Sequence, residues 1–315
     1  MSPITRILSP FARIQSQGAG FKMARNLTHD AMATTRSKQS NAVALREQLP
    51  FWPNDQRGLP NCLARSALFT VANVRSGRRE HLKRQLIKTM DGTTIHYTGS
   101  ELRQDDEDCF MHILHVARMH TLGTEVRFTA HNMLVQLNWS PNSASYKRLV
   151  DCIDRLQATS ISITVEDPTR GVRENYTGSL LRSFRWREMA SDAPMREWVI
   201  LLEPEIVALF SPTSYSQIEW KTRMSLGPMA KWLHSFYHTL ETPIPMQVPV
   251  MRELMGSKAK ELRQFRYKLR QALEQLVEQG FLMDAQIDTT TDFVLVQRGP
   301  VRSLPAPAAQ PALAS

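Results

Sequence analysis

Residues 256–276 read GSKAKELRQFRYKLRQALEQL, and this stretch separates its apolar side chains from its basic ones. At about 100° per residue, the apolar side chains fall on one stripe of a single helix, which predicts that this stripe faces a core. They are Leu262, Phe265, Leu269, Ala272, Leu273 and Leu276. The opposite stripe carries no acid before Glu274 and consists of Lys260, Arg263, Gln264, Tyr267 and Arg270. A basic face is usually just solvated, but these long donors are also the side chains that contact phosphates and base edges in DNA.

The composition agrees with a polyanionic partner. The chain has 315 residues, enough for about two domains, and 42% of them are hydrophobic, enough for packed cores. It holds 39 Lys and Arg against 30 Asp and Glu, which gives a net charge of +9 and a sequence pI near 9.7. This excess favours nucleic acid or an acidic membrane surface. Because no run of about 18 apolar residues occurs, the sequence predicts no transmembrane helix.

The two ends of the chain differ in composition from the middle. Residues 1–47 are rich in Ser, Thr, Gln, Ala and Arg, and residues 299–315 read GPVRSLPAPAAQPALAS, so both ends are predicted to be flexible. The N-terminal part is basic but lacks the continuous apolar stretch of a secretory signal. Widely spaced cysteines fit a reducing compartment, so we expect a cytoplasmic protein. They are Cys62, Cys109 and Cys152.

The middle of the chain contains an internal repeat at an offset of 120 residues, with residues 125–165 aligned on 245–285. The aligned apolar pairs are Phe128 with Val248, Leu134 with Leu254, Leu149 with Leu269, Ile153 with Leu273, and Leu156 with Leu276. Each copy is expected to run helix, short strand, short helix, turn, long helix and hairpin, which is the winged-helix order. The predicted fold is therefore α+β, with tandem winged-helix (helix-turn-helix) domains. Their expected ranges are 55–190 and 191–298, between flexible segments at 1–54 and 299–315.

The two copies differ in charge. On the first long helix, Lys147 is offset by Asp151 and Asp154, whereas the equivalent face of the second long helix is cationic. The second copy is therefore expected to read bases, and the first to pack, dimerise or touch the DNA backbone. A basic run at residues 75–88, RSGRREHLKRQLIK, precedes the first copy. It is interpreted either as a solvated helix or as an arm that clamps the DNA backbone.

Candidate DNA contacts follow for both copies. Those in the second copy lie in the turn before the long helix, on that helix, and in the hairpin turn DTTT at 288–291. They are Ser257, Lys258, Lys260, Arg263, Gln264, Arg266, Tyr267, Arg270 and Thr290. Those in the first copy and the basic run are Lys147, Arg148, Arg78, Arg79, Lys83 and Arg84. The first hairpin is expected to have strands at 160–167 and 175–186, with a turn at Pro168 and Gly171.

Several segments, taken in their order along the chain, are similar to a known family. They are LPFWPNDQRGLPN (49–61), RSALFTV (65–71), IHYTGSELRQDDED (95–108), IDRLQATSISI (153–163), PEIVALF (204–210) and the block 220–280. Over about residues 45–298 the chain resembles the TrfA-type replication initiators of broad-host-range IncP plasmids.

The resemblance implies a non-enzymatic protein without a cofactor. Such initiators carry two winged-helix domains that bind directly repeated origin sequences, called iterons, and help to open an adjacent A+T-rich segment. The implied partners are double-stranded iteron DNA, single-stranded A+T-rich DNA, a host initiator ATPase, the replicative helicase, the polymerase sliding clamp and a second copy of the chain. A winged-helix transcriptional regulator is the alternative, because fold alone does not fix function.

The resemblance also directs attention to QLPFW at residues 48–52. This segment is similar to the short peptides that polymerase clamps bind in an apolar pocket. The candidate clamp-binding residues are Gln48, Leu49, Phe51 and Trp52. The alternative is a hydrophobic strap docked on the first domain.

Patterns for catalysis are missing. The chain lacks the phosphate-binding pattern GxxxxGK[ST], and we expect no metal site. The spacings of Cys109, His112 and His115, and of His234 and His238, allow a metal in principle, but packed or solvated histidines are favoured. The acids at 105–108 are interpreted as the first turn of a helix, where they complement its dipole.

Overall fold

The computed structural model describes residues 48–72, 77–90, 92–167, 171–186, 197–211 and 213–299. Most of the terminal segments expected to be flexible, and the turn at Pro168, lie outside these residues. The described residues lie in one compact unit of mixed α+β structure. Its buried apolar residues gather in two cores. The first runs from Leu49 to Trp220, and the second runs from Leu226 to Val294 with Val71 added.

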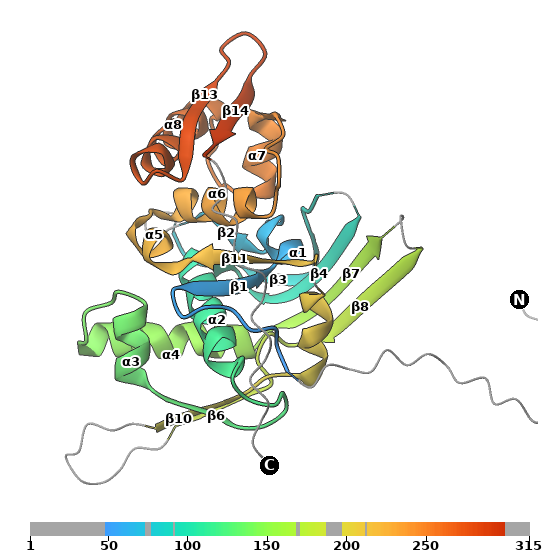
Figure 1. Cartoon of the computed structure of the whole chain (residues 1–315), viewed down its shortest axis with the longest axis vertical. Helices are drawn as coiled ribbons and strands as arrows, with labels where there is room; N and C mark the ends of the chain where they lie inside the picture. The colour runs from blue at the N-terminus through green and yellow to red at the C-terminus, as the bar shows by residue number, and fades with distance from the viewer. Residues whose placement is uncertain are drawn as a thin grey trace, which may run out of the picture. The chain divides into compact units, whose positions relative to one another are not determined.

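The helices around the first core lie before residue 226 (Figure 1). They are α1 (Asn61–Ala64), α2 (Gln104–Ala117), α3 (Ala130–Gln136), α4 (Ser143–Gln157), the 3-10 helix η2 (Pro204–Phe210) and α5 (Trp220–Ser225). Two small sheets accompany them, antiparallel β1 (Gln56–Pro60) with β11 (Tyr215–Glu219), and parallel β2 (Phe69–Thr70) with β5 (Leu102–Arg103). A four-stranded antiparallel sheet has the order β3 (His81–Ile87), β4 (Thr93–Ser100), β7 (Ser160–Asp167), β8 (Val172–Gly178). A three-stranded sheet has the order β6 (Val126–Thr129), β10 (Glu197–Leu201), β9 (Ser183–Trp186).

The second core, drawn in orange and red in Figure 1, is smaller. Its elements are α6 (Pro228–His238), β12 (Met246–Gln247), α7 (Val248–Leu254), α8 (Leu262–Glu278), β13 (Leu282–Ile287) and β14 (Phe293–Arg298). The strands form one antiparallel sheet in the order β12-β14-β13. Helix α8 buries the side chains of Phe265, Leu269, Ala272, Leu273 and Leu276. The apolar stripe found in the sequence therefore faces this core.

The element order predicted from the repeat occurs in both parts. β6, α3, α4, β7 and β8 follow one another around the first core, as β12, α7, α8, β13 and β14 do around the second. The aligned residues Leu149 and Leu269 are both fully buried, as are Ile153 and Leu273. The repeat in apolar spacing therefore corresponds to a repeat in structure.

The two copies use their hairpins differently. In the second copy the hairpin strand β14 pairs with β12, which precedes α7. In the first copy the hairpin β7–β8 instead pairs with β4, while β6 pairs with β10. The expected strand at 175–186 is also divided, because Leu180 and Leu181 are buried in the core between β8 and β9.

The division between the cores lies nearer to α5 than the boundary expected at residues 190–191. Strand β10 pairs with β6, and β11 pairs with β1, so the segment 197–219 completes the first core. The second core begins with Leu226. The expected boundary divides strands that pair with each other, and this is why the structure differs from it.

Two expected helices were wrong in part. The stretch 256–276 is not one helix, because Gly256, with φ +57°, ends α7 and α8 begins at Leu262. The basic run 75–88 contains the strand β3, since the hydrogen-bonding partner β4 lies beside it. A bulge interrupts this pairing between Leu82 and Gln85, where Arg84 has φ 44°. In the described ranges, no helix has both the length and the apolar character needed to cross a bilayer.

Candidate nucleic-acid interface

Helix α8 presents a basic and polar face to solvent. The exposed side chains of its first three turns are Arg263, Gln264, Tyr267, Lys268, Arg270 and Gln271, with Lys260 exposed just before the helix; the exposed acid Glu274 follows one turn later. Tyr267 is 60% exposed and accepts a hydrogen bond of 3.0 Å from Gln271 Nε2. Lys268 and Gln271 were not among the predicted contacts. Their spacing could have indicated them, because Lys268 lies four residues after Gln264 and Gln271 lies four residues after Tyr267, which places each beside a predicted contact on the helix surface. The face therefore offers more donors than predicted.

A groove of about 510 Å³ lies beside this face. Gln264, Lys268 and Gln271 line it from α8, and residues 227–229 line it from the start of α6. The backbone N–H of Gly227 donates to Gln275 Oε1 at 3.1 Å, which holds the beginning of α6 against α8. The exposed face of α8 thus continues into a polar groove.

Arg266 is engaged within the protein rather than free on this face. Its Nε lies 2.7 Å from Asp292 Oδ1, and its second nitrogen lies 2.8 Å from Asp292 Oδ2. The hydrogen bond from Arg266 lowers the pKa of the Asp292 carboxyl. Thr290 is exposed in the turn of the β13–β14 hairpin, where its N–H donates to Asp288 Oδ1 at 2.7 Å. Both predicted contacts thus lie near α8, but only Thr290 presents a free side-chain surface.

Lys258 also differs from the prediction. Its Nζ lies 3.0 Å from Glu80 Oε1 and 3.1 Å from Glu101 Oε2. Partial burial opposes the charged amine, but the hydrogen bonds to both carboxylates raise the pKa of Lys258 above its ordinary value. Its neighbour Ser257 is half-buried in the turn, and its N–H donates to the carbonyl of Arg252. The turn before α8 is therefore tied to the first core and contributes no free cation at Lys258.

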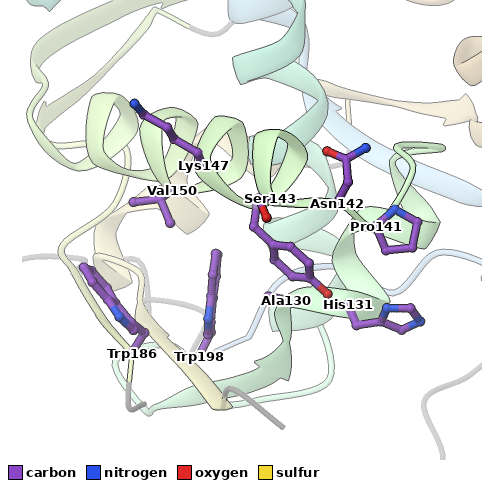
Figure 2. Close-up of a pocket in the computed structure, with 10 residues that line it drawn as sticks. Ala130, His131, Pro141, Asn142, Ser143, Lys147, Val150, Trp186 and Trp198 are labelled. Carbon is purple, nitrogen blue, oxygen red and sulfur yellow. The ribbon is translucent and has the colours of Figure 1, made fainter. Parts of the chain in front are cut away.

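On the first long helix, α4, the predicted cations are less free than those of α8. Lys147 is exposed at the rim of a cavity of about 650 Å³, with Trp186 and Trp198 on the strands opposite (Figure 2). Arg148 lies 3.8 Å from the ring centre of Trp139 and 3.5 Å from Asp105. Exposed acids also follow on this helix, so α4 has no continuous cationic face.

The basic run before the first copy divides into two kinds of residue. Arg78 is exposed, as are Lys83 and Arg84 on the edge strand β3. Arg79 instead points into the fold, where it lies 2.9 Å from Asp105 and 2.6 Å from Asp106. Arg79 is therefore paired within the fold by two carboxylates, and a contact with DNA would require it to release them.

The four consecutive acids at the start of α2, Asp105 to Asp108, each form an ion pair with an arginine or lysine from outside this helix. Asp106 lies 2.8 Å from Arg155 of α4. Glu107 lies 2.8 Å and Asp108 lies 2.7 Å from Arg223 of α5, which is fully buried. Asp108 also lies 2.5 Å from Lys231 of α6. The helix dipole alone does not account for these acids, and Asp108, through Lys231, connects the first core to the second.

The TrfA protein family model matches residues 17–298 of the chain. The chain belongs to the TrfA family. It is 28% identical over 238 residues to the plasmid replication initiator protein TrfA from Escherichia coli. That match covers 75% of this chain and 61% of the relative, so this TrfA-family chain spans less than two thirds of the relative's length.

Among solved structures, the chain is similar to domains 2 and 3 of RctB. A selenomethionine crystal structure of these domains has a TM-score of 0.49 at 11% identity, covering 73% of this chain and 94% of that one. A second crystal structure of RctB domains 2–3 has a TM-score of 0.47 at 11% identity, covering 72% of this chain and 84% of that one.

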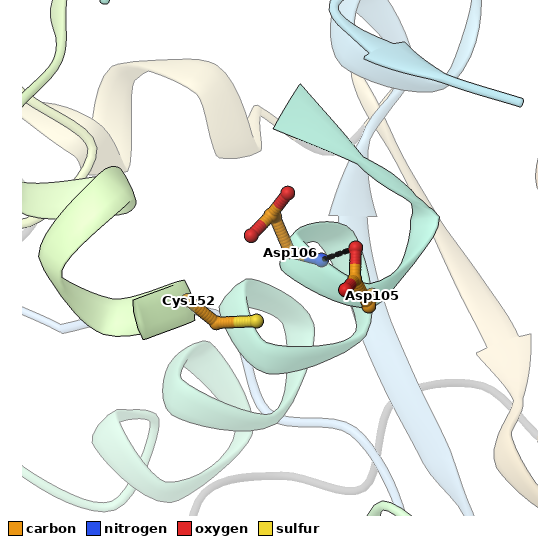
Figure 3. A group of neighbouring side chains, drawn as sticks. All are labelled: Asp105, Asp106 and Cys152. Atoms are coloured by element: carbon orange, nitrogen blue, oxygen red, sulfur yellow. Dashed lines mark hydrogen bonds between the residues drawn. The ribbon is translucent and has the colours of Figure 1, made fainter. Parts of the chain in front are cut away.

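One cluster in this TrfA-family chain has the residue types of a cation site. Ligand atoms of Asp105, Asp106 and Cys152 lie within 4.8 Å of one another (Figure 3). The carboxylates already face the guanidinium groups of Arg79 and Arg155. A hydrogen bond with another thiol, together with burial, raises the pKa of Cys152 well above its ordinary value. A protonated thiol beside neutralised acids does not suit a metal ion.

The histidines considered as metal ligands are packed. Burial and the charges of Arg57 and Arg118 lower the pKa of His115 to about 2, so the ring is neutral. Its Nδ1 accepts a hydrogen bond from Trp52 Nε1 at 3.0 Å. Burial likewise lowers the pKa of His238 to about 3, and its Nε2 lies 3.2 Å from Nε2 of His234. The rings of His115 and His238 therefore hydrogen-bond to neighbouring side chains inside the protein.

The segment 48–52 is docked on the first core. Leu49 is 1% exposed, and Trp52 is 0% exposed and stacks on Phe210 with ring centres 6.0 Å apart. Gln48 Nε2 donates to the carbonyl of Arg118 at 3.0 Å. Only Phe51 is exposed, at 44%. The side chains that a clamp pocket requires are thus occupied inside the fold, and the structure agrees with the hydrophobic strap rather than with a free clamp-binding peptide.

Proposed function

We propose that this TrfA-family protein is a plasmid replication initiator that binds directly repeated origin sequences, with α8 as the helix that reads bases. The observation that carries the proposal is the cationic face of α8, which carries no acid from Arg263 to Arg270 and lies after the short helix α7 and before the hairpin β13–β14. This order is that of a winged-helix module, and β6 to β8 repeat it around the first core. Family membership supports the role in plasmid replication.

The chemistry of the exposed face suits the major groove. Arg263 and Arg270 are seven positions apart and therefore lie two turns apart on one side of α8, with Tyr267 between them. An arginine in this position can donate two N–H groups to O6 and N7 of guanine, which is the commonest specific contact. Exposed Gln264 and Gln271 can form two hydrogen bonds with adenine. Lys268 and Lys260 supply charge for the phosphates.

The first module is proposed to contact the DNA backbone rather than the bases. The exposed residues Lys147, Arg78, Lys83 and Arg84 are proposed to touch the DNA backbone, because phosphates accept any cation and demand no exact geometry. The protein acts in this proposal by binding and not by catalysis. Opening of A+T-rich DNA, contact with single strands, self-association and recruitment of a host initiator ATPase, helicase and sliding clamp are further proposals, which family membership supports.

The test measures affinity for DNA with direct repeats and for random DNA of equal length. Replacing Arg263 or Arg270 with Ala is expected to cost about 1–3 kcal/mol on the repeats and to relax the preference at one base pair. Arg173→Ala, which removes an exposed arginine of β8, is the matched control and should leave base preference unchanged. Equal losses on both DNAs mean that the residue touches phosphate only. Unchanged binding by both variants rules out α8 as the reader.

A second measurement separates an initiator from a transcriptional regulator. The protein is supplied from a separate replicon to a plasmid whose origin carries the repeats. An initiator sustains replication of that plasmid, and Arg263→Ala lowers its copy number. A regulator binds the repeats but leaves the plasmid unreplicated.

A further inference from the structure

The turn of the second hairpin is internally closed. Asp288 N–H donates to the carbonyl of Phe293 at 2.9 Å, and Asp292 N–H donates to the carbonyl of Asp288 at 2.9 Å. The side chain of Asp288 accepts from the N–H groups of Thr290 and Thr291 at 2.7 and 3.0 Å. The turn is therefore a small rigid body with exposed threonines at its tip.

Asp292 attaches this rigid body to both helices of the helix-turn-helix. Its carboxylate receives two parallel hydrogen bonds from Arg266 of α8. Its carbonyl accepts from the N–H of Val248, the first residue of α7, at 3.0 Å. Its backbone lies in the left-handed region, with φ 59°. One residue thus joins the hairpin turn, the short helix and the long helix.

Arg266 lies at the flank of the exposed face of α8. At about 100° per residue, it is rotated by about 60° from Arg263, and the rotation points toward the hairpin turn. Its guanidinium already donates two hydrogen bonds to the Asp292 carboxylate. Ion pairs with two parallel hydrogen bonds are stronger than hydrogen bonds between neutral groups. Contact with a guanine would require Arg266 to release Asp292.

We infer that Arg266 is a positioning residue that holds the hairpin turn beside the reading face of α8. The exposed Thr289, Thr290 and Thr291 are then carried to the DNA backbone next to the bases that α8 contacts. A turn that is fixed before binding does not have to be ordered on binding, which preserves affinity. The inference rests on the proposed function, since it gives the hairpin a role in the same DNA complex.

The decisive variant is Asp292→Ala. Removing an acid beside a polyanion ordinarily strengthens binding, whereas loss of the anchor weakens it, so the two explanations differ in sign. We expect about fivefold weaker binding to repeat DNA, the factor expected for a well-formed exposed ion pair. Asp284→Ala, which removes another exposed acid from the same hairpin, is the control and should bind as well as the wild type or better.

Arg266→Lys gives an independent reading because it keeps the charge and loses the two-pronged bond. A positioning role predicts weaker binding, and a simple phosphate contact predicts nearly normal binding. Exchanging the pair, Arg266→Asp with Asp292→Arg, should recover affinity to within about twofold of the wild type. Thermal unfolding of the Arg266 variants should stay close to that of the wild type, because the pair is partly exposed. The Asp292 variants should unfold at a slightly lower temperature, because Ala and Arg are less favourable than Asp at a φ of 59°.

Unchanged or tighter binding by Asp292→Ala overturns the inference. So does a normal Arg266→Lys variant together with an Arg266→Ala variant whose salt slope falls by about one, since that identifies a direct phosphate contact. A wild-type protein that does not prefer repeat DNA contradicts the proposed function itself. In that case the ratio of Asp292→Ala to wild-type affinity on random DNA still shows whether the Arg266–Asp292 pair contributes to DNA binding.

Discussion

Phe51 and Trp52 are adjacent aromatic residues with opposite surroundings. Trp52 is fully buried, donates to His115 and stacks on Phe210, whereas Phe51 is 44% exposed. We expect Trp52→Ala to lower the free energy of unfolding by about 3–5 kcal/mol, because a large cavity and an unpaired histidine nitrogen remain. Phe51→Ala is the matched control and should have a small effect. Urea unfolding measures both, and similar losses from the two variants would contradict a docked strap.

At this scale the sequence predicts residue types on a face but not which of them are free. Arg263 and Arg266 are three positions apart on α8, and both belong to its basic side. Only the structure separates them, because the partner Asp292 lies 26 positions away. The same holds for Arg79 and Lys258, whose carboxylate partners come from other elements. A local pattern contains no information on such distant partners.

Among the elements, the edge strand β3 offers the cleanest test of backbone contacts. Lys83 and Arg84 are exposed on it, at a bulge that interrupts pairing with β4. If both meet phosphates, replacing them with Ala should flatten the slope of log K against log salt by about 0.9 for each phosphate that is no longer neutralised. Base preference should not change, since phosphates carry no sequence information.

Arg79→Ala is the contrasting variant for this element. Its guanidinium pairs with Asp105 and Asp106 inside the fold, so its loss should lower thermal stability more than it changes the salt slope. An unchanged slope in the Lys83 and Arg84 variant would show that this strand edge is merely solvated.

The long helices were predictable as elements, whereas the strand β3 was not. Helices α4 and α8 bury the apolar positions that their periodicity selects, and periodicity is a property of neighbouring residues. A single helix over 256–276 begins too early, because Gly256 adopts a positive φ and α8 begins at Leu262; the turn expected at Ser257 and Lys258 is present. Strand β3 was missed because a strand is stabilised by a partner, here β4, that periodicity cannot reveal.

At the scale of the whole molecule, Arg223 joins the two cores. It is fully buried and bonds to Glu107 and Asp108 of α2 and to Ser235 of α6. We expect Arg223→Ala to lower the free energy of unfolding by about 3–5 kcal/mol, because it removes the ion pair of the buried Glu107 and leaves Asp108 with Lys231 alone. The control is Arg173→Ala, whose pair with Glu166 is exposed, and it should change stability little. Equal losses in urea unfolding would contradict a stabilising role of the buried network.

The pairing of β1 with β11 determines how much of the chain must be synthesised before the first core can fold. Strand β1 begins at Gln56, but its partner β11 is not complete until Glu219 has been made. Strand β6 likewise pairs with β10, which is synthesised later. The first core therefore cannot close while the ribosome is still making the segment before residue 219. Until then the nascent chain holds β1 and β6 with unpaired edges, which exposes them to chaperones and to other chains. The smaller second core is complete once Val294 has been made, so it closes soon after the first.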